Sequence, residues 1–233
     1  MVKVAIRRFL PKEFYAVEAI KTLRTNLLFS GDEYRVIALT SQSASAGKSS
    51  ISFQLAASLA LTGKRVLLLD TDLRKSVLAH RFAVKEKVDG LSHLLSGMAK
   101  PHDVLCETDL PGLYMIFAGA RVPNPAEILG GHRFTSLISV LRTMFDYVIV
   151  DTAPLGQVID CAIIAPNVDG TLIVVDVMKN SYKLERRIKR QLEKAGAKVL
   201  GVVLNRVNYK DKTGYYGKAY RYGYGYGYGY GEK

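Results

Sequence analysis

The apolar residues along the chain form a pattern that predicts an α/β fold. Short, nearly continuous apolar runs predict buried strands at residues 36–39, 66–69, 113–117, 147–150, 171–175 and 199–204. Apolar residues at helical spacing predict helices at 13–29, 51–61, 90–96, about 123–145 and 181–195, the fourth broken near Gly130 and Gly131. Strands that alternate with helices are typical of a mostly parallel sheet with helices on both faces.

The two ends of the chain differ from this pattern. Residues 1–12 carry four basic groups and a proline, which predicts an N-terminal arm. In the helix that follows, Glu18, Lys21 and Arg24 are spaced by three and therefore share one face. Ion pairing within a solvated helix explains this spacing, and a contact between subunits is the alternative.

After residue 207 the composition changes abruptly. This segment holds nine of the fourteen tyrosines, and residues 222–231 alternate strictly between tyrosine and glycine. Glycine at every second position disfavours a packed core. The sequence thus predicts one folded domain at 1–207, with the arm and first helix at 1–30, and a flexible, disordered tail at 208–233.

Length, charge and cysteine content indicate the number of domains, the kind of partner and the cellular compartment. A length of 233 residues suits one core, and the net charge of +12 indicates an anionic partner, without choosing among nucleotide, acidic protein, membrane surface and nucleic acid. The two cysteines are far apart in sequence, which suits a reducing, cytoplasmic setting. Neither a signal peptide nor an apolar run of about 18 residues is present.

Residues 40–50 lie between a predicted strand and a predicted helix, the layout of a phosphate-binding loop. In such a loop, backbone N–H groups and the positive end of the helix bind phosphate oxygens. Lys48 would reach the terminal phosphates and the Ser49 hydroxyl would hold Mg²⁺. Gln42 and Ser45 replace expected glycines, so a serine-rich turn that caps a core helix is the alternative. The predicted nucleotide-binding residues of the loop are Ser45, Ala46, Gly47, Lys48, Ser49 and Ser50.

Carboxylates follow two of the predicted strands. Asp70 and Asp72 come at the end of the strand at 66–69, and Asp151 follows the strand at 147–150. Buried carboxylates need compensating cations or hydrogen bonds, and open α/β sheets bind ligands at these strand ends. A metal or general-base role is favoured, whereas a helix N-cap would require only one of Asp70 and Asp72. After the last strand, Asn205 and Arg206 could contact adenine, although a turn explains an asparagine equally well.

These motifs and the tail resemble the bacterial tyrosine kinases of capsular polysaccharide synthesis, of the Gram-positive type with a separate membrane activator. The resemblance covers about residues 13–233 and includes Walker A at 40–50, Walker A′ at 66–74, Walker B at 148–154 and the segments 123–129 and 200–206. It implies a P-loop NTPase-like fold, ATP and Mg²⁺ as ligands, and Asn205 beside the adenine. It also implies ring-shaped homo-oligomers formed through Glu18, Lys21 and Arg24, where Lys21 replaces a family arginine.

The resemblance also implies roles in tyrosine phosphorylation. Lys48, Asp70, Asp72 and Asp151 would be catalytic, with Mg²⁺ held by Ser49, Asp72 and Asp151 and the phenol oriented by Asp70 or, alternatively, Asp72. The implied partners are a tyrosine phosphatase and a membrane-anchored activator that recruits the cytoplasmic chain to the inner face of the membrane, and not nucleic acid. The expected phosphate acceptors are Tyr215, Tyr216, Tyr220, Tyr222, Tyr224, Tyr226, Tyr228 and Tyr230.

Two other functions fit parts of the sequence. One is an ATPase switch like those of plasmid partition and division-site placement, which binds a membrane or nucleic acid without kinase activity. Those relatives carry a lysine where this chain has Ser43, which argues against this class. The other is a non-catalytic scaffold with a degraded loop, a reading that rests on Gln42 and Ser45 but conflicts with the intact Lys48 and the three aspartates.

Overall fold

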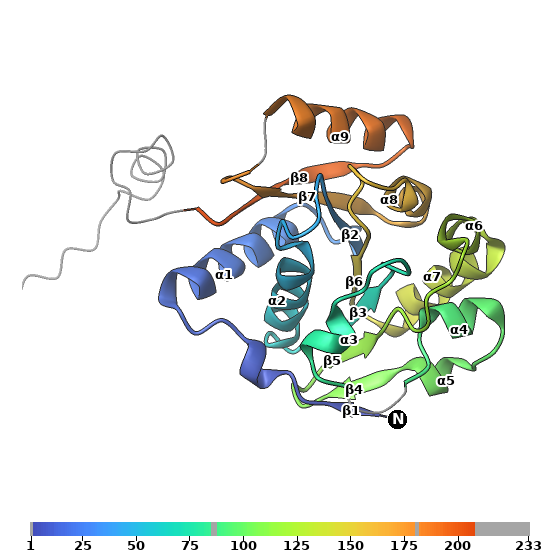
Figure 1. Cartoon of the computed structure of the whole chain (residues 1–233). Coiled ribbons are helices and arrows are strands. Elements are labelled where there is room, and N and C mark those ends of the chain that lie inside the picture. Colours follow the sequence, from blue (N-terminus) through green and yellow to red (C-terminus); the bar gives the residue numbers. More distant parts are fainter. Residues whose placement is uncertain (1, 85–87, 180–181, 208–233) are drawn as a thin grey trace, which may run out of the picture.

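A computed structural model describes residues 2–84, 88–179 and 182–207 of the chain (Figure 1). The predicted tail at 208–233, with all of its tyrosines, lies outside the described residues. All six predicted strands are present: β2 (Val36–Ser41), β3 (Val66–Asp70), β5 (Leu113–Ile116), β6 (Tyr147–Asp151), β7 (Gly170–Asp176) and β8 (Val199–Asn205).

The predicted helices are present as well. The structure contains α1 (Phe14–Phe29), α2 (Lys48–Ala60), α4 (Leu91–Ser96) and α9 (Tyr182–Lys194), and the segment at 123–145 is split into α6 (Pro125–Gly130) and α7 (His132–Met144). Helix α2 begins three residues earlier than predicted, because its first turn is the polar Lys48-Ser49-Ser50 that apolar periodicity does not mark. The short helical elements were not predicted from the sequence: α3 (Leu78–Arg81), α5 (Pro101–Val104), α8 (Asp160–Ile164) and the 3₁₀ turns Arg7–Phe9 and Ala165–Asn167.

The strands form one mostly parallel sheet in the order β1-β4-β5-β3-β6-β2-β7-β8. Only the pairing of β4 (Cys106–Thr108) with β5 is antiparallel among the described strands. Helices cover both faces of the sheet (Figure 1). The predicted P-loop NTPase-like α/β class is therefore confirmed.

The N-terminal segment predicted as an arm packs onto the sheet. Strand β1 (Lys3–Val4) pairs with β4, and the side chains of Val4 and Ile6 are buried. The Asp109 carboxylate accepts a hydrogen bond of 2.7 Å from the backbone N–H of Ile6. Two alternating apolar residues among basic ones are too weak a signal to predict a strand, so this edge was missed.

Successive side chains along the buried strands point to opposite faces of the sheet, so the hydrophobic core is divided between these two faces. In β2, Ile37 and Leu39 face α1 and α2, whereas Val36 and Ala38 face α4, α6 and α7. Over β7, the α9 residues Ile188 and Leu192 close the second face at that end of the sheet. Because β2, β3, β6 and β7 are parallel, their carboxyl ends meet at one edge, and this edge carries the candidate site.

Candidate active site

The loop between β2 and α2 has two residues in the left-handed backbone region. Ser45 has φ of 64° and Gly47 has φ of 90°. A Cβ atom at residue 47 would lie 2.0 Å from Nδ2 of Asn205, so Gly47 is required both for its backbone angle and for this close approach. Ser45 occupies the conformation that a glycine would adopt without strain, at a cost of roughly 1–2 kcal/mol.

Asn205 and Arg206, at the carboxyl end of β8, hold the loop by hydrogen bonds. Asn205 Nδ2 donates a 2.8 Å hydrogen bond to the Ala46 carbonyl, and Arg206 Nη2 donates one of 2.9 Å to the Ser45 carbonyl. The other guanidinium nitrogen, Nη1, forms an ion pair with the buried Asp176. The amide that was predicted to contact adenine is thus engaged with the loop, and its contact with a nucleotide stays a prediction.

A cavity of 390 Å³ opens along the loop and the first turn of α2. Residues 43–50 line one side of it, and Asp72 and Arg206 lie on the others. Among the described residues, Asp72 provides the one carboxylate of the lining, against five basic side chains: Lys48, Arg74, Lys75, Arg81 and Arg206. This excess of positive charge, next to the unsatisfied N–H groups of a helix N-terminus, suits a polyanion such as a triphosphate.

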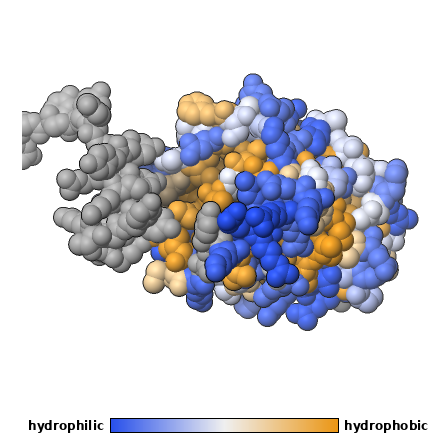
Figure 2. All heavy atoms as spheres, turned by 90° about the horizontal axis from the view of Figure 1, so that it is seen from above, coloured by the Kyte–Doolittle hydropathy of each residue, from blue (hydrophilic) through white to orange (hydrophobic). Residues whose placement is uncertain are grey.

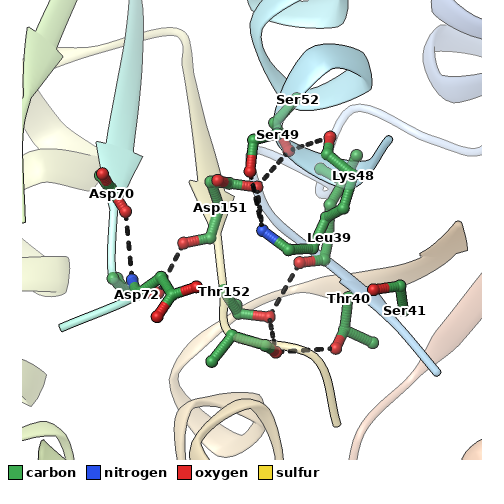
Figure 3. A network of polar contacts seen from close by, with 12 residues as sticks. Leu39, Thr40, Ser41, Lys48, Ser49, Ser52, Asp70, Asp72, Asp151 and Thr152 are labelled. Carbon is green, nitrogen blue, oxygen red and sulfur yellow. Dashed lines mark hydrogen bonds and ion pairs between the residues drawn. The ribbon is translucent and has the colours of Figure 1, made fainter. Parts of the chain in front are cut away.

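Lys48 extends from the first turn of α2 toward Asp151 at the end of β6 (Figure 3). Its Nζ atom lies 2.6 Å from Asp151 Oδ1 and 3.2 Å from Ser49 Oγ. Ser52, one turn further along α2, donates a 2.8 Å hydrogen bond to the same Asp151 oxygen. Lys48 and Asp151 are both buried, so each compensates the other in a region of low dielectric.

Asp70 and Asp72 differ in environment although they are two residues apart. Asp70 is buried opposite Asp151 in the β3–β6 register and accepts hydrogen bonds from the Ser76 hydroxyl and, at 3.1 Å, from the Asp72 N–H. Asp72 is half-buried, and its Oδ1 accepts a 2.9 Å hydrogen bond from the Lys75 N–H, which fixes the carboxylate at the cavity wall. Asp72 is therefore the carboxylate that a bound ligand meets first.

Burial raises the pKa of the Asp70 carboxyl from 3.8 to about 7, with the nearby Asp151 carboxylate as the second cause. Between these two values the folded chain keeps a proton that the unfolded chain has released. The free energy of unfolding is therefore expected to fall as pH rises from about 4 to about 7, by up to about 1.4 kcal/mol per pH unit.

This dependence can be measured by denaturant unfolding across that pH range in the presence of EDTA. The Asp70→Asn variant should lose this part of the slope, because it has no proton to release. Asp32→Asn, which removes an exposed carboxylate, serves as the matched control. A slope in Asp70→Asn equal to that of the unmodified chain would refute the assignment.

A second cavity, of 630 Å³, adjoins the first at Asp72. Ser76, His80, Phe117 and Arg121 are among the residues that line it, and no residue of the loop at 43–50 does so. Asp72 thus stands between a basic cavity along the loop and a separate, mixed polar and apolar cavity. This layout provides room for two different ligands on either side of one carboxylate.

Several site residues were not identified from the sequence. Asp160, fully buried at the start of α8, holds the Arg74 guanidinium by two hydrogen bonds of 2.7 and 2.9 Å. Arg81 donates a 2.6 Å hydrogen bond to the Ser50 hydroxyl. Neither residue belongs to a local motif, and their partners lie 86 and 31 positions away, so only the fold brings them together.

The donor set is suited to magnesium held jointly with phosphates. No group of three or more His, Cys, Asp or Glu side chains is preassembled as a metal site within the described part of the chain. Mg²⁺ usually takes one or two protein oxygens together with substrate phosphates and water, and Ser49 and Asp72 both line the loop cavity. Asp151 is not among the residues that line the loop cavity, and it forms an ion pair with Lys48.

Two of the three charged residues of α1 pair with each other, and the third contacts α2. Lys21 and Glu18 form an intrahelical ion pair of 2.7 Å, as the simpler explanation of their spacing predicts. Arg24 instead donates hydrogen bonds of 3.0 and 3.2 Å to the Ser58 carbonyl and hydroxyl on α2. Within residues 2–84, 88–179 and 182–207, no helix combines the length and the apolar character that crossing a bilayer requires.

The comparisons with known proteins agree with this geometry. The model of the CobQ/CobB/MinD/ParA nucleotide-binding domain matches residues 37–221. The tyrosine-protein kinase CpsD of Streptococcus agalactiae is 40% identical over 205 residues, which is 86% of this chain and 90% of that protein.

Two solved structures are similar over most of the chain. The chimerical protein CapA2B2 superposes with a TM-score of 0.80 at 30% identity, covering 89% of this chain and 94% of that one. The kinase domain of the Escherichia coli tyrosine kinase ETK superposes with a TM-score of 0.80 at 32% identity, covering 92% of this chain and 80% of that one.

Proposed function

Since the chain belongs to the family of CpsD-type bacterial tyrosine-protein kinases, we propose that it transfers the γ-phosphoryl group of ATP to tyrosines of its own C-terminal tail. The observation that carries the proposal is the convergence of Lys48, Asp72 and Asp151 beside a basic cavity at one sheet edge. Relatives named as tyrosine-protein kinases support the reaction type. We further propose that this activity regulates capsular or exopolysaccharide synthesis and export.

The triphosphate is held by the backbone N–H groups of the loop and by Lys48. Lys48 pairs with Asp151 and also lies 3.2 Å from Ser49 Oγ in the first turn of α2, so its ammonium group stands beside the loop that would hold the terminal phosphate. Ser49 and, directly or through water, Asp72 and Asp151 would hold Mg²⁺, which would supply positive charge beside the phosphates. The chain's own contribution is mainly positioning and charge stabilisation, as phosphoryl transfer requires.

The acceptor phenol approaches Asp72 from the second cavity. There the phenol oxygen attacks the γ-phosphorus, the bond to the leaving ADP oxygen breaks, and the phenolic proton passes to a carboxylate. Asp72 is exposed to both cavities, whereas Asp70 is enclosed behind Ser76, so Asp72 is favoured for orienting the phenol. Asp70 supports this role by accepting the N–H of Asp72, although its raised pKa would also suit a base.

The tail can reach such a site. A glycine-rich segment of about 25 residues spans roughly 25–30 Å on average, which reaches the site of the same chain or of a neighbour. In an oligomer, transfer between subunits would occur at high local concentration. Three large apolar side chains of α1 support self-association, because Phe14, Tyr15 and Phe29 are 69%, 64% and 85% exposed. We therefore keep the proposed ring, with Glu18, Lys21 and Arg24 near its contacts.

The remaining partners belong to the same proposal. A membrane-anchored activator would recruit the chain to the inner face of the membrane, and a tyrosine phosphatase would reverse the modification. The chimerical nature of the CapA2B2 relative supports a partner protein.

Intact mass spectrometry tests the proposed reaction. The purified chain, first treated with a tyrosine phosphatase that is then removed, should gain several phosphates on incubation with ATP and Mg²⁺, and peptide mapping should place them on tyrosines in 208–233. EDTA should prevent the gain. ADP formation without phosphate on the tail would favour the alternative, an ATPase switch of the MinD/ParA kind, and would refute the kinase proposal.

A further inference from the structure

Helix α9 carries a strongly basic outer face. Lys183, Arg187, Arg190 and Lys194 follow one another at spacings of four, three and four residues, so they lie along one side of the helix. All four are exposed, and within the described residues none of them forms an ion pair. Seen from above, the molecule is strongly hydrophilic where α9 lies (Figure 2). We call these four residues the α9 basic face.

Packing of the helix does not require this charge. The opposite side of α9 buries Ile188 and Leu192 against β7, which accounts for the position of the helix. Beside the basic face, Lys189 forms an ion pair of 3.5 Å with Glu193. Like charges on one side of a helix repel one another, so the face is expected to bind an anion that offsets this cost.

The shape of the face indicates the class of anion. A shallow depression of 660 Å³ is lined by the four residues together with Arg186 and Gln191, and none of the described residues that line it is acidic. A guanidinium group binds a phosphate through two parallel N–H···O hydrogen bonds. An open row of basic side chains suits phosphates spaced along an extended chain better than it suits one enclosed ion. A helix that lies on a membrane keeps an apolar face for the lipid, whereas the apolar face of α9 is used in the core.

The last described residue, Val207, lies close to one end of this face. Helix α9 connects two parallel strands, β7 and β8, so its first residues lie at the sheet edge where β8 ends (Figure 1). A random coil of 26 residues, the number that follow residue 207, would span roughly 28 Å on average, and α9 is about 20 Å long. The tail of the same chain can therefore cover the whole face.

Phosphorylation reverses the charge of the tail. Residues 208–233 contain five basic and two acidic residues, so the unmodified tail has a net charge of +3 and is repelled by the α9 basic face. Each phosphotyrosine adds roughly −1.5 to −2 charges, so two or three of them make the tail anionic. The same segment is thus repelled before modification and attracted after it.

We propose that the α9 basic face is a binding surface for the phosphotyrosine tail of the same chain. This inference rests on the proposed function, because it requires a phosphorylated tail. Docking on α9 would hold modified tyrosines away from the loop cavity, so that unmodified ones or those of a neighbouring chain take their place.

Fluorescence anisotropy with synthetic peptides tests this surface on the full chain. The protein is treated with a tyrosine phosphatase, which is then removed, and no ATP is added. A peptide of residues 220–231 with phosphate on Tyr222, Tyr226 and Tyr230 should bind at least about 10-fold more tightly than the unmodified peptide. The Arg187→Glu/Arg190→Glu variant should lose at least about 10-fold in affinity, and Arg187→Gln/Arg190→Gln should lose part of it.

The matched control is Lys12→Glu/Lys64→Glu, which makes the same change in net charge at two exposed positions away from α9. Equal losses in control and α9 variants would overturn the proposal, as would equal binding of the two peptides. Vesicles containing phosphatidylserine provide the other arm: sedimentation with vesicles that depends on Arg187 and Arg190, without phosphopeptide binding, would assign the face to a membrane instead. Because the peptides are synthetic, these results do not depend on whether the chain phosphorylates itself.

Discussion

Replacement of Lys48 by methionine is expected to lower tyrosine phosphorylation by about 10³-fold. The loss follows because the variant has no cation at the loop to stabilise charge on the transferred phosphoryl group. The substitution also leaves Asp151, which is 1% exposed, without its partner at 2.6 Å. Breaking a buried pair in this way should lower the free energy of unfolding by about 3–5 kcal/mol.

A double variant separates these two effects. Lys48→Met/Asp151→Asn removes both charges and should recover most of the lost stability, as measured by denaturant unfolding, while phosphorylation stays absent. Lys64→Met, at an exposed lysine in the loop before β3, is the control for loss of a positive charge. Phosphorylation that returns with stability in the double variant would mean that Lys48 is structural and not catalytic.

Asp72→Asn is expected to have the second large effect, a fall in kcat of about 10²–10⁴-fold. Asparagine has the shape of the aspartate but lacks the negative charge needed to bind Mg²⁺ and to orient the phenol. Because Asp72 is half-buried at a cavity wall, the unfolding midpoint should change little. Phosphate incorporation into the tail, followed by mass spectrometry, gives the rate.

Two further measurements make this result specific to Asp72. Nucleotide binding in EDTA should be retained in Asp72→Asn, whereas the enhancement of binding by Mg²⁺ should be reduced. Asp32→Asn, far from the cavity lining, should match the unmodified chain in both respects. A fully active Asp72→Asn variant would contradict the assignment of the carboxylate between the two cavities.

Local patterns in the sequence were sufficient to predict much of the fold. The loop at 40–50 and the aspartates at 70, 72 and 151 each follow an apolar run that is long enough to identify as a strand. Parallel strands then imply that their ends meet at one edge, and the structure brings these residues together there. The break between α6 and α7 at Gly130 and Gly131 could also be predicted, because glycine pairs interrupt helices.

Contacts between distant segments could not be predicted in the same way. The ion pair of Arg74 with Asp160 and the hydrogen bond of Asn205 to Ala46 join residues 86 and 159 positions apart. Neither pair has a local signature, since each depends on how loops from different strands meet. Likewise, the burial of Asp70 and its closeness to Asp151, which together raise its pKa, exist only in the folded chain. A strand of two residues such as β1 is too short for periodicity to reveal.

A crystal structure of the chain with a non-hydrolysable ATP analogue and Mg²⁺ tests the central claim most directly. We expect the triphosphate along residues 45–50, with Lys48 in contact with a terminal phosphate and Mg²⁺ roughly 2.0–2.1 Å from the Ser49 hydroxyl oxygen. Asp72 should lie beside the γ-phosphate and face the second cavity. A nucleotide bound away from this loop, or a metal ion remote from Ser49, Asp72 and Asp151, would contradict the claim.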